Sequence, residues 1–200
     1  MPLRNDSSRW GSVSIGLHWL TLVLVLGMAA VGLLMVDMAA SPFKVQVYSW
    51  HKSFGLTVLA LTAIRLAWRL TDRSPEPMPG TPGWQHGIAR ATHGGLYLLL
   101  LVVPLSGWWF NSAAGFPLRW FGLVALPRLA SFDAHAKSLA RQTHELLFYV
   151  LAGLILVHAI AALWHHYVLK DRTLTRMLPA PGSVELARAG TPSPAFTKDP

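Results

Sequence analysis

Four long stretches of almost uninterrupted apolar residues divide this chain of 200 residues. They cover positions 15–36, 49–70, 91–110 and 142–169. Each stretch reaches the ~20 residues that a helix needs to cross a bilayer. An amphipathic helix of a soluble bundle would keep a polar stripe along one face, and these stretches have no such stripe. The pattern predicts an all-α fold, an integral membrane bundle of four helices in up-and-down order.

The connections between these stretches are short or rich in turn-forming residues. Ser41 and Pro42 break the chain after the first helix, and the loop 71–87 is rich in Pro and Gly, which predicts irregular structure. In the longest connection, 111–140, the segment WFGLVALP is expected to lie along the membrane interface, and DAHAKSLARQ is expected to extend the fourth helix outward. Residues 1–179 are therefore expected to form one domain. Residues 180–200 are low in apolar content and are expected to form a disordered tail.

The composition supports the membrane assignment and excludes several kinds of site. Hydrophobic residues make up 52% of the chain and charged residues only 13%, too few charges for an ordinary soluble surface. The chain has no cysteine, which excludes disulfides, iron–sulfur clusters and thiolate metal sites. The first apolar run is too long for the core of a signal peptide and is read as the first membrane helix.

The net charge of +8 is informative through its distribution. Four spans place both termini on the same side of the membrane. If that side is the cytoplasm, eleven of the 17 Lys and Arg residues lie in inner segments, and six lie in outer ones: Lys44, Lys52, Arg119, Arg128, Lys137 and Arg141. The positive-inside rule favours this orientation. The basic excess therefore predicts a multi-pass protein of the bacterial inner membrane with cytoplasmic termini, and nucleic-acid binding is disfavoured.

The fourth apolar stretch carries two histidines on one face. His144 and His158 are fourteen residues apart, which returns the helix to within about 40° of the same direction after a rise of about 21 Å. Imidazoles inside a bilayer are costly and usually face the bundle interior. The second helix places His51 near the outer end, and the first places His18 near the inner end. Depth therefore predicts the pairs His51 with His144 and His18 with His158.

Two imidazoles from different helices that face each other across a flat gap are what a six-coordinate b-type haem requires. The sequence therefore predicts two haem b groups, stacked across the membrane. His93 lies at nearly the same depth as His18, next to two glycines, and remains an alternative inner ligand. Gly55 shares a face with His51 and is expected to leave room for a large flat group.

Basic residues near each pair are candidates to hold the haem carboxylates. Arg65 lies fourteen residues after His51, near the inner pair, where a guanidinium could bind a propionate through two hydrogen bonds. Lys52 and Arg141 are expected to play this part near the outer pair.

Several segments resemble the prokaryotic cytochrome b561 family: LHWL, WHKSFG, THGGLY, and THELLFYVLAGLILVHAIAALWHHY followed by KDRTLTRMLP. The likeness extends from Arg9 to Pro179. It implies a four-helix cytochrome with two b haems, and it implies axial ligands at His18, His51, His144 and His158. It also implies electron transfer to quinone, and one member of the family oxidises superoxide on the outer side while it reduces ubiquinone.

The resulting hypothesis is a membrane oxidoreductase that takes electrons from a small anionic or protein donor on the outer, periplasmic side and passes them to ubiquinone. Six outer Lys and Arg residues could steer a small anion such as superoxide. Quinone is expected beside the inner haem, where His165, seven residues beyond His158, could donate a hydrogen bond and relay a proton.

Two alternatives remain at this stage. The chain could be a cytochrome b anchor that serves a partner dehydrogenase or a soluble cytochrome. The histidine pairs could instead bind metal ions in a transporter, although carboxylates inside the spans, which a cation path would need, are nearly absent.

Overall fold

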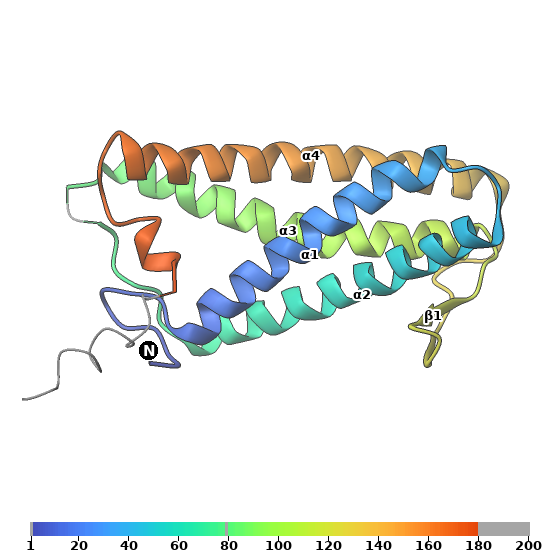
Figure 1. Ribbon diagram of the computed structural model, residues 1–200, viewed down its shortest axis with the longest axis horizontal. Coiled ribbons are helices and arrows are strands. Elements are labelled where there is room, and N and C mark those ends of the chain that lie inside the picture. Colours follow the sequence, from blue (N-terminus) through green and yellow to red (C-terminus); the bar gives the residue numbers. More distant parts are fainter. Residues whose placement is uncertain (1, 79, 180–200) are drawn as a thin grey trace, which may run out of the picture.

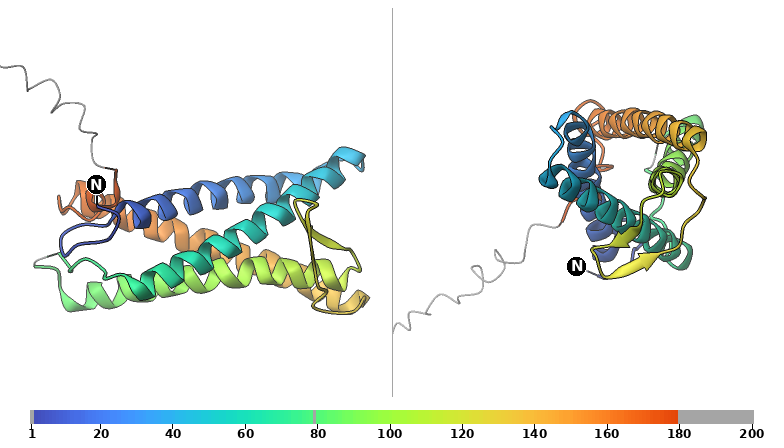
Figure 2. Two further views of the ribbon diagram at one scale, coloured as in Figure 1. Left: turned by 90° about the horizontal axis from the view of Figure 1, so that it is seen from below. Right: turned by 90° about the vertical axis from the view of Figure 1, so that its right-hand side faces the viewer.

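The computed structural model describes residues 2–78 and 80–179, so the tail at 180–200 lies outside the described residues. Four helices run side by side in up-and-down order around a common axis (Figures 1 and 2). The elements are α1 (Ser12–Asp37), α2 (Pro42–Thr71), α3 (Gly83–Ala113), β1 (Leu118–Trp120), β2 (Val124–Leu126), α4 (Ala134–Tyr167) and the short 3₁₀ helix η1 (Thr175–Met177). All four α-helices are long and apolar enough to cross a membrane, which confirms the predicted all-α membrane bundle.

The helices extend beyond the apolar stretches because local capping residues, rather than apolar residues, set their ends. Ser41 caps α2 by accepting a hydrogen bond from the Lys44 backbone at 3.1 Å. Asp133 caps α4 by accepting one from the Ala136 backbone at 2.6 Å, so the predicted outward extension of this helix is confirmed. The loop predicted at 71–87 is wrong for its last residues, because α3 already begins at Gly83, directly after a proline.

The core of the bundle lies between the two levels of histidines. Its buried apolar residues are Val58, Leu99, Leu100 and Leu151, contributed by α2, α3 and α4. The largest fully buried side chains are the small polar residues Thr62, Ser53 and Ser112. Most of the larger apolar side chains face outward, as expected where lipid rather than water surrounds the helices.

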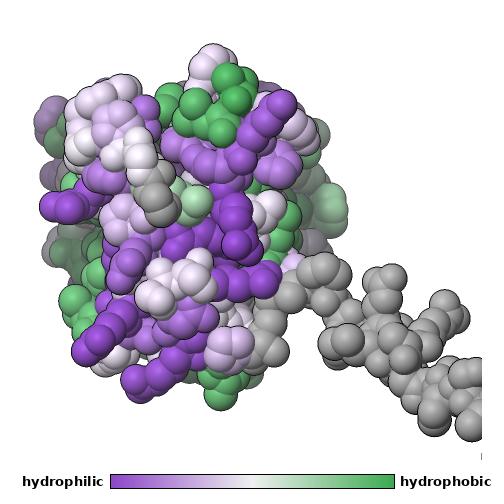
Figure 3. All heavy atoms as spheres, turned by 90° about the vertical axis from the view of Figure 1, so that its left-hand side faces the viewer, coloured by the Kyte–Doolittle hydropathy of each residue, from purple (hydrophilic) through white to green (hydrophobic). Residues whose placement is uncertain are grey.

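The two ends of the bundle are built differently. We call the end with the α1–α2 turn and the two strands the hairpin end, and the opposite end, which carries the N-terminal segment and η1, the terminal end (Figure 1). At the terminal end, Arg176 donates hydrogen bonds to the carbonyls of Ser8 and Glu76, and Arg9 donates one to the carbonyl of Leu178. These bonds tie three segments into a cap, and Figure 3 shows that this face is largely hydrophilic.

The β-hairpin was not anticipated from the sequence. β1 and β2 pair antiparallel, with Leu118 opposite Leu126 and Trp120 opposite Val124. The turn between them places Phe121 (φ 48°) and Gly122 (φ 76°) in the left-handed region, as a type I′ turn requires. The usual sequence signal for this turn is Asn-Gly or Asp-Gly. This chain has a Phe-Gly pair within an apolar run instead, so the turn could not be recognised from the sequence.

Candidate functional site

One pair of histidines lies toward the hairpin end. His51 from α2 and His144 from α4 face each other with ring centres 6.4 Å apart and ring planes at 85°. The two residues are 93 positions apart in the sequence, so only the folding of the whole bundle brings them together. This is the pair that their depth in the sequence predicts.

The two rings of the hairpin-end pair differ in their polar contacts. The Nδ1 atom of His144 lies 3.0 Å from the carbonyl oxygen of Val103, which can only accept, so Nδ1 carries the proton and Nε2 keeps a free lone pair. Ser106 Oγ lies 3.0 Å from the same Nδ1 atom. Nδ1 of His51 is buried, lies on the side of the ring that faces Gly32 of α1, and has no hydrogen-bond partner among the described residues.

Two glycines allow these imidazoles to lie close to neighbouring helices. A Cβ atom at Gly32 of α1 would come within 3.1 Å of His51 Cε1, and one at Gly107 of α3 would come within 3.1 Å of His144 Cε1. Each imidazole therefore lies in close contact with a helix other than its own. Gly55, which the sequence suggested as the residue that makes room, would place a Cβ at an ordinary 3.7 Å from Met28 Cε.

A second group of histidines lies toward the terminal end, where His158 of α4 has two neighbours. The ring of His18 on α1 lies 6.4 Å from it with an interplanar angle of 63°, and the ring of His93 on α3 lies 5.3 Å from it at 67°. Arg65 of α2 places an NH2 nitrogen 2.9 Å from His18 Nδ1. All four helices therefore contribute to this group.

The ring distances can be compared with what a shared metal ion requires. Bonds from an imidazole nitrogen to a metal are about 2.0 Å long, so rings on opposite sides of one metal have centres about 6.4 Å apart. The pair His51–His144 and the pair His18–His158 both have 6.4 Å, whereas His93–His158 has 5.3 Å. The spacing of the two 6.4 Å pairs would therefore leave room for a metal ion between the rings, and the spacing of the shorter pair would not.

A cavity of about 590 Å³ opens beside the terminal-end histidines. A volume of this size is typical of sites for small molecules and cofactors. Its lining includes the three histidines of this group together with Arg65, Arg69, Tyr97, His86 and His165. It is bounded toward the terminal end by the cap segments, including Arg176 and Met177.

The basic residues named from the sequence lie at different places. The guanidinium groups of Arg65 and Arg69 stand over the ring of Tyr97, at 5.4 and 5.7 Å from its centre. Lys52 is half-buried and donates a hydrogen bond to the Asn111 side chain at 3.2 Å, inside the hairpin end of the bundle. Arg141 is exposed in the first turns of α4.

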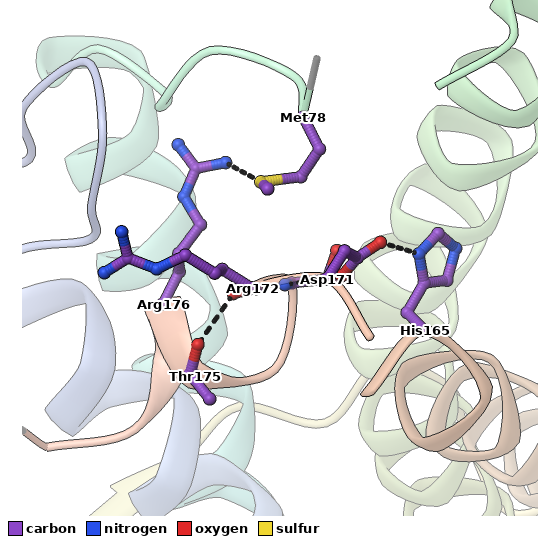
Figure 4. A network of polar contacts seen from close by, with 7 residues as sticks. Met78, His165, Asp171, Arg172, Thr175 and Arg176 are labelled. Atoms are coloured by element: carbon purple, nitrogen blue, oxygen red, sulfur yellow. Dashed lines mark hydrogen bonds and ion pairs between the residues drawn. The ribbon is translucent and has the colours of Figure 1, made fainter. Parts of the chain in front are cut away.

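His165 has a partner that the sequence did not suggest. Its Nδ1 atom lies 2.5 Å from the Asp171 carboxylate, in the turn that follows α4 (Figure 4). Burial alone would raise the pKa of the Asp171 carboxyl, but hydrogen bonds from His165 and Thr173 outweigh burial and hold that pKa below its usual value. Asp171 is therefore a charged acceptor that keeps the proton of His165 on Nδ1, with Nε2 of the ring as its second polar atom.

Sequence reasoning missed four contributors to the site: Gly32, Val103, Gly107 and Asp171. The two glycines matter through contacts between helices, which no local pattern specifies. Val103 acts through its backbone carbonyl, which is independent of its side chain. A detectable signal existed only for Asp171, a lone carboxylate six residues after a histidine at a helix end.

Known proteins resemble this chain over most of its length. The family described as "Prokaryotic cytochrome b561" matches residues 9–180. "Cytochrome b561 homolog 2" of Escherichia coli K12 is 34% identical over 179 residues, which is 89% of this chain and 95% of the relative. "Probable superoxide oxidase CybB" of Yersinia pestis is 31% identical over 171 residues, 86% of this chain and 96% of the relative. "Cytochrome b561 homolog 1" of Escherichia coli K12 is 32% identical over 173 residues, 86% of this chain and 98% of the relative.

Proposed function

Because the chain belongs to the prokaryotic cytochrome b561 family, we propose that it is a di-haem oxidoreductase that carries electrons across the bacterial inner membrane from superoxide to ubiquinone. The observation that carries this proposal is the occurrence of two histidine pairs with the same ring spacing of 6.4 Å, one in each half of the bundle. Haem b binding and transmembrane electron transfer are the general properties of the family. The number of haems, the donor and the acceptor are the specific part of the proposal.

In this proposal His51 and His144 hold one haem, and His18 and His158 hold the other. Each haem b, when bound, supplies a carrier that accepts and donates one electron. The carbonyl of Val103 fixes the His144 tautomer, so that Nε2 of this ring is ready to bind a metal. With two imidazoles bound, an iron would have no open position, which would favour electron transfer without direct oxygen binding.

Arg65 contacts one of the proposed ligands at the terminal end. A guanidinium only donates, so its contact with His18 Nδ1 places the proton of this ring on Nε2. Ligation through Nε2 requires the opposite tautomer, with the proton on Nδ1, and therefore releases Arg65. The freed guanidinium lies beside the 590 Å³ cavity and can pair with a propionate carboxylate there.

The hairpin end is suited to receive electrons from a small anion. It holds six Lys and Arg residues, five of them besides Lys52, which points into the bundle, whereas the carboxylates in the same segments are Asp37, Asp133 and Glu145. A positive surface raises the local concentration of an anionic donor. With the terminal end in the cytoplasm, as the positive-inside rule favours, this surface faces the periplasm, and so does the His51–His144 pair.

The terminal end is suited to bind quinone. The cavity there brings His165 to the same space as His158, with the Asp171 carboxylate behind His165. Reduction of one ubiquinone to ubiquinol consumes two electrons and two protons. Two superoxide ions supply the electrons and leave as two O₂ molecules, and the protons come from the cytoplasm. In this proposal the Asp171 carboxylate orients the ring of His165, and an Nε2–H of that ring would donate to a quinone oxygen.

The proposal predicts that the purified holoprotein alone, in lipid nanodiscs, contains two b haems and reduces ubiquinone when superoxide is supplied. Pyridine haemochrome analysis measures the haems, and the fall in quinone absorbance measures the reaction. The rate should fall as ionic strength rises, because salt screens surface charges beyond a Debye length of about 8 Å. Two haems without superoxide-driven reduction would refute the donor and favour a cytochrome subunit that serves a protein partner. An absence of b-type bands would refute the class.

A second prediction tests the quinone site. His165→Ala is expected to slow ubiquinone reduction by roughly 10²-fold or more, the range seen when a general acid is removed, while superoxide still reduces both haems. His166→Ala is the matched control, because His166 is the next residue on α4 and does not line the cavity. Stopped-flow absorbance separates haem reduction from quinone reduction. Equal quinone kinetics in the His165 variant and its control would place the quinone elsewhere.

A further inference from the structure

The contact between α3 and α4 repeats every seven residues along the two helices. Near the hairpin end, Gly107 of α3 lies against His144 of α4, because a Cβ at Gly107 would come within 3.1 Å of His144 Cε1. Seven residues closer to the terminal end on each helix, Leu100 and Leu151 belong to the same buried cluster. A repeat of seven residues is expected for two helices that keep the same faces together.

The repeat continues into the cavity at the terminal end. Its third step is the pair His93 and His158, whose ring centres are 5.3 Å apart. One further step of seven residues leads to His86 of α3 and His165 of α4. Both helices are continuous through these positions, and both side chains line the cavity of about 590 Å³. The repeat therefore places two more imidazoles on the facing sides of α3 and α4, nearer the end of the bundle.

We propose that His86 and His165 bind the two ends of the ubiquinone headgroup, and that His86 is the second proton donor. This inference rests on the proposed function, in which quinone binds in this cavity beside His165. The headgroup carries two carbonyl oxygens at opposite ends of one ring. A site that binds both oxygens at once therefore needs a second donor, and His86 supplies it from the opposite helix.

Several other donors in the lining of the cavity already have partners. The indole N–H groups of Trp19 and Trp68 and the side-chain amide of Asn5 donate to other groups of the protein. The guanidinium of Arg176 donates to backbone carbonyls of the cap. His86, in contrast, is half-buried and makes no side-chain hydrogen bond with another residue that the structure describes. Its ring is therefore available to a ligand in the cavity.

The chemistry of the reaction also selects a histidine at this place. Arg69 and Gln85 line the same cavity, but a guanidinium stays charged and an amide does not release a proton, so neither can act as a proton donor. An imidazole gains and loses a proton near neutral pH. Among these three neighbouring side chains, only His86 can both hold a quinone oxygen and protonate it.

A metal site built from the same histidines is disfavoured. No three His, Asp or Glu side chains in the described part of the chain come close enough to share a metal ion. Asp171, which contacts Nδ1 of His165 (Figure 4), is therefore not a third ligand with His86. Two imidazoles on opposite helices, with a cavity beside them, suit a flat ligand that accepts a hydrogen bond at each end.

Both electrons and protons can reach this level of the bundle. About 10 Å, or two helical turns, separates it from the level of His93 and His158. His86 is the fourth residue of α3, at the end of the bundle whose face is largely hydrophilic (Figure 3). One N–H proton goes to each quinone oxygen, and the two electrons come from two superoxide ions as proposed above. Water at the terminal end then restores the proton of each imidazole.

The test observes the two carbonyl groups of the quinone separately. Ubiquinone with ¹³C at one carbonyl or at the other is added to the purified holoprotein in nanodiscs, and infrared difference spectra are recorded while an electrode reduces the protein. The electrode replaces superoxide, so the identity of the donor does not affect the result. Ile88→Ala is the matched control for His86→Ala, because Ile88 is on the same helix, is 58% exposed and does not line the cavity.

We expect hydrogen bonds to lower the frequencies of both carbonyls in the unaltered protein. His86→Ala should return one labelled carbonyl to its frequency in lipid, His165→Ala should return the other, and Ile88→Ala should change neither. His86→Gln should keep the lowered frequency, because the amide still donates a hydrogen bond, yet quinone reduction should slow roughly 10²-fold, as in His86→Ala. If His86→Ala does not assemble with two haems, His86→Phe takes its place, since it keeps a ring without a donor.

The other outcomes separate this inference from the proposed function. Unchanged carbonyls in His86→Ala, with one carbonyl altered in His165→Ala, would overturn the inference and leave the quinone site in place. The same carbonyl altered in both variants would also overturn it, because the two histidines would then serve one oxygen. Unchanged carbonyls in both variants would overturn the quinone site together with the inference.

Discussion

Replacing either His51 or His144 by alanine is expected to remove one and the same haem, which lowers the content from two haems per chain to one. The physical reason is that the two rings, 6.4 Å apart, can share a single iron. Loss of either ring leaves that iron with one protein ligand in a pocket shaped by Gly32 and Gly107 for two imidazoles. The remaining haem should keep its low-spin spectrum, since the buried cluster around Leu151 separates the two levels.

Haem content by pyridine haemochrome and the low-spin signals in electron paramagnetic resonance together measure this outcome. His135→Ala is the matched control, because His135 is an exposed histidine on the same helix as His144, and it should retain both signals. Different signals lost in the His51 and His144 variants, or two haems retained in both, would show that the rings do not share an iron.

The membrane fold follows from the sequence because it depends on composition along each helix. Four long apolar windows with few charged residues are sufficient to predict four spans, and the family match confirms the resemblance noted from the histidine-bearing motifs. The ends of the helices are less predictable, since single contacts such as the Asp133 cap decide them. The β-hairpin could not be predicted from the sequence for a related reason, because its attachment depends on Ser53, a residue 65 positions away from Leu118.

The depth of each histidine could be read from the sequence, because residues in a helix advance by a constant rise. Depth alone left His18 and His93 equivalent as partners of His158. The choice between them depends on the lateral positions of α1 and α3 around α4, which arise from packing between helices. Our proposal for His18 rests on the two ring distances in the structure, 6.4 Å for His18–His158 and 5.3 Å for His93–His158.

These distances lead to the second large effect. His18→Ala and His158→Ala are each expected to remove the haem nearest the terminal end, whereas His93→Ala should retain it. The 6.4 Å spacing of His18 and His158 would accommodate an iron between the rings, whereas the 5.3 Å between His93 and His158 is about 1 Å too short for two bonds of about 2.0 Å on opposite sides of a metal. His93 then lines the cavity beside the haem.

Haem content, low-spin resonance signals and the midpoint potential of the remaining haem distinguish the three variants. The His93 variant should keep two haems, with a shift in one potential, because a polar neighbour of the haem has been removed. His86→Ala serves as the control, since His86 lines the same cavity but belongs to neither 6.4 Å pair. A terminal-end haem that survives in the His18 variant and is lost in the His93 variant would make His93 the ligand. In that case α3 and α4 would have to separate on haem binding, and the contact of Arg65 with His18 would persist in the holoprotein.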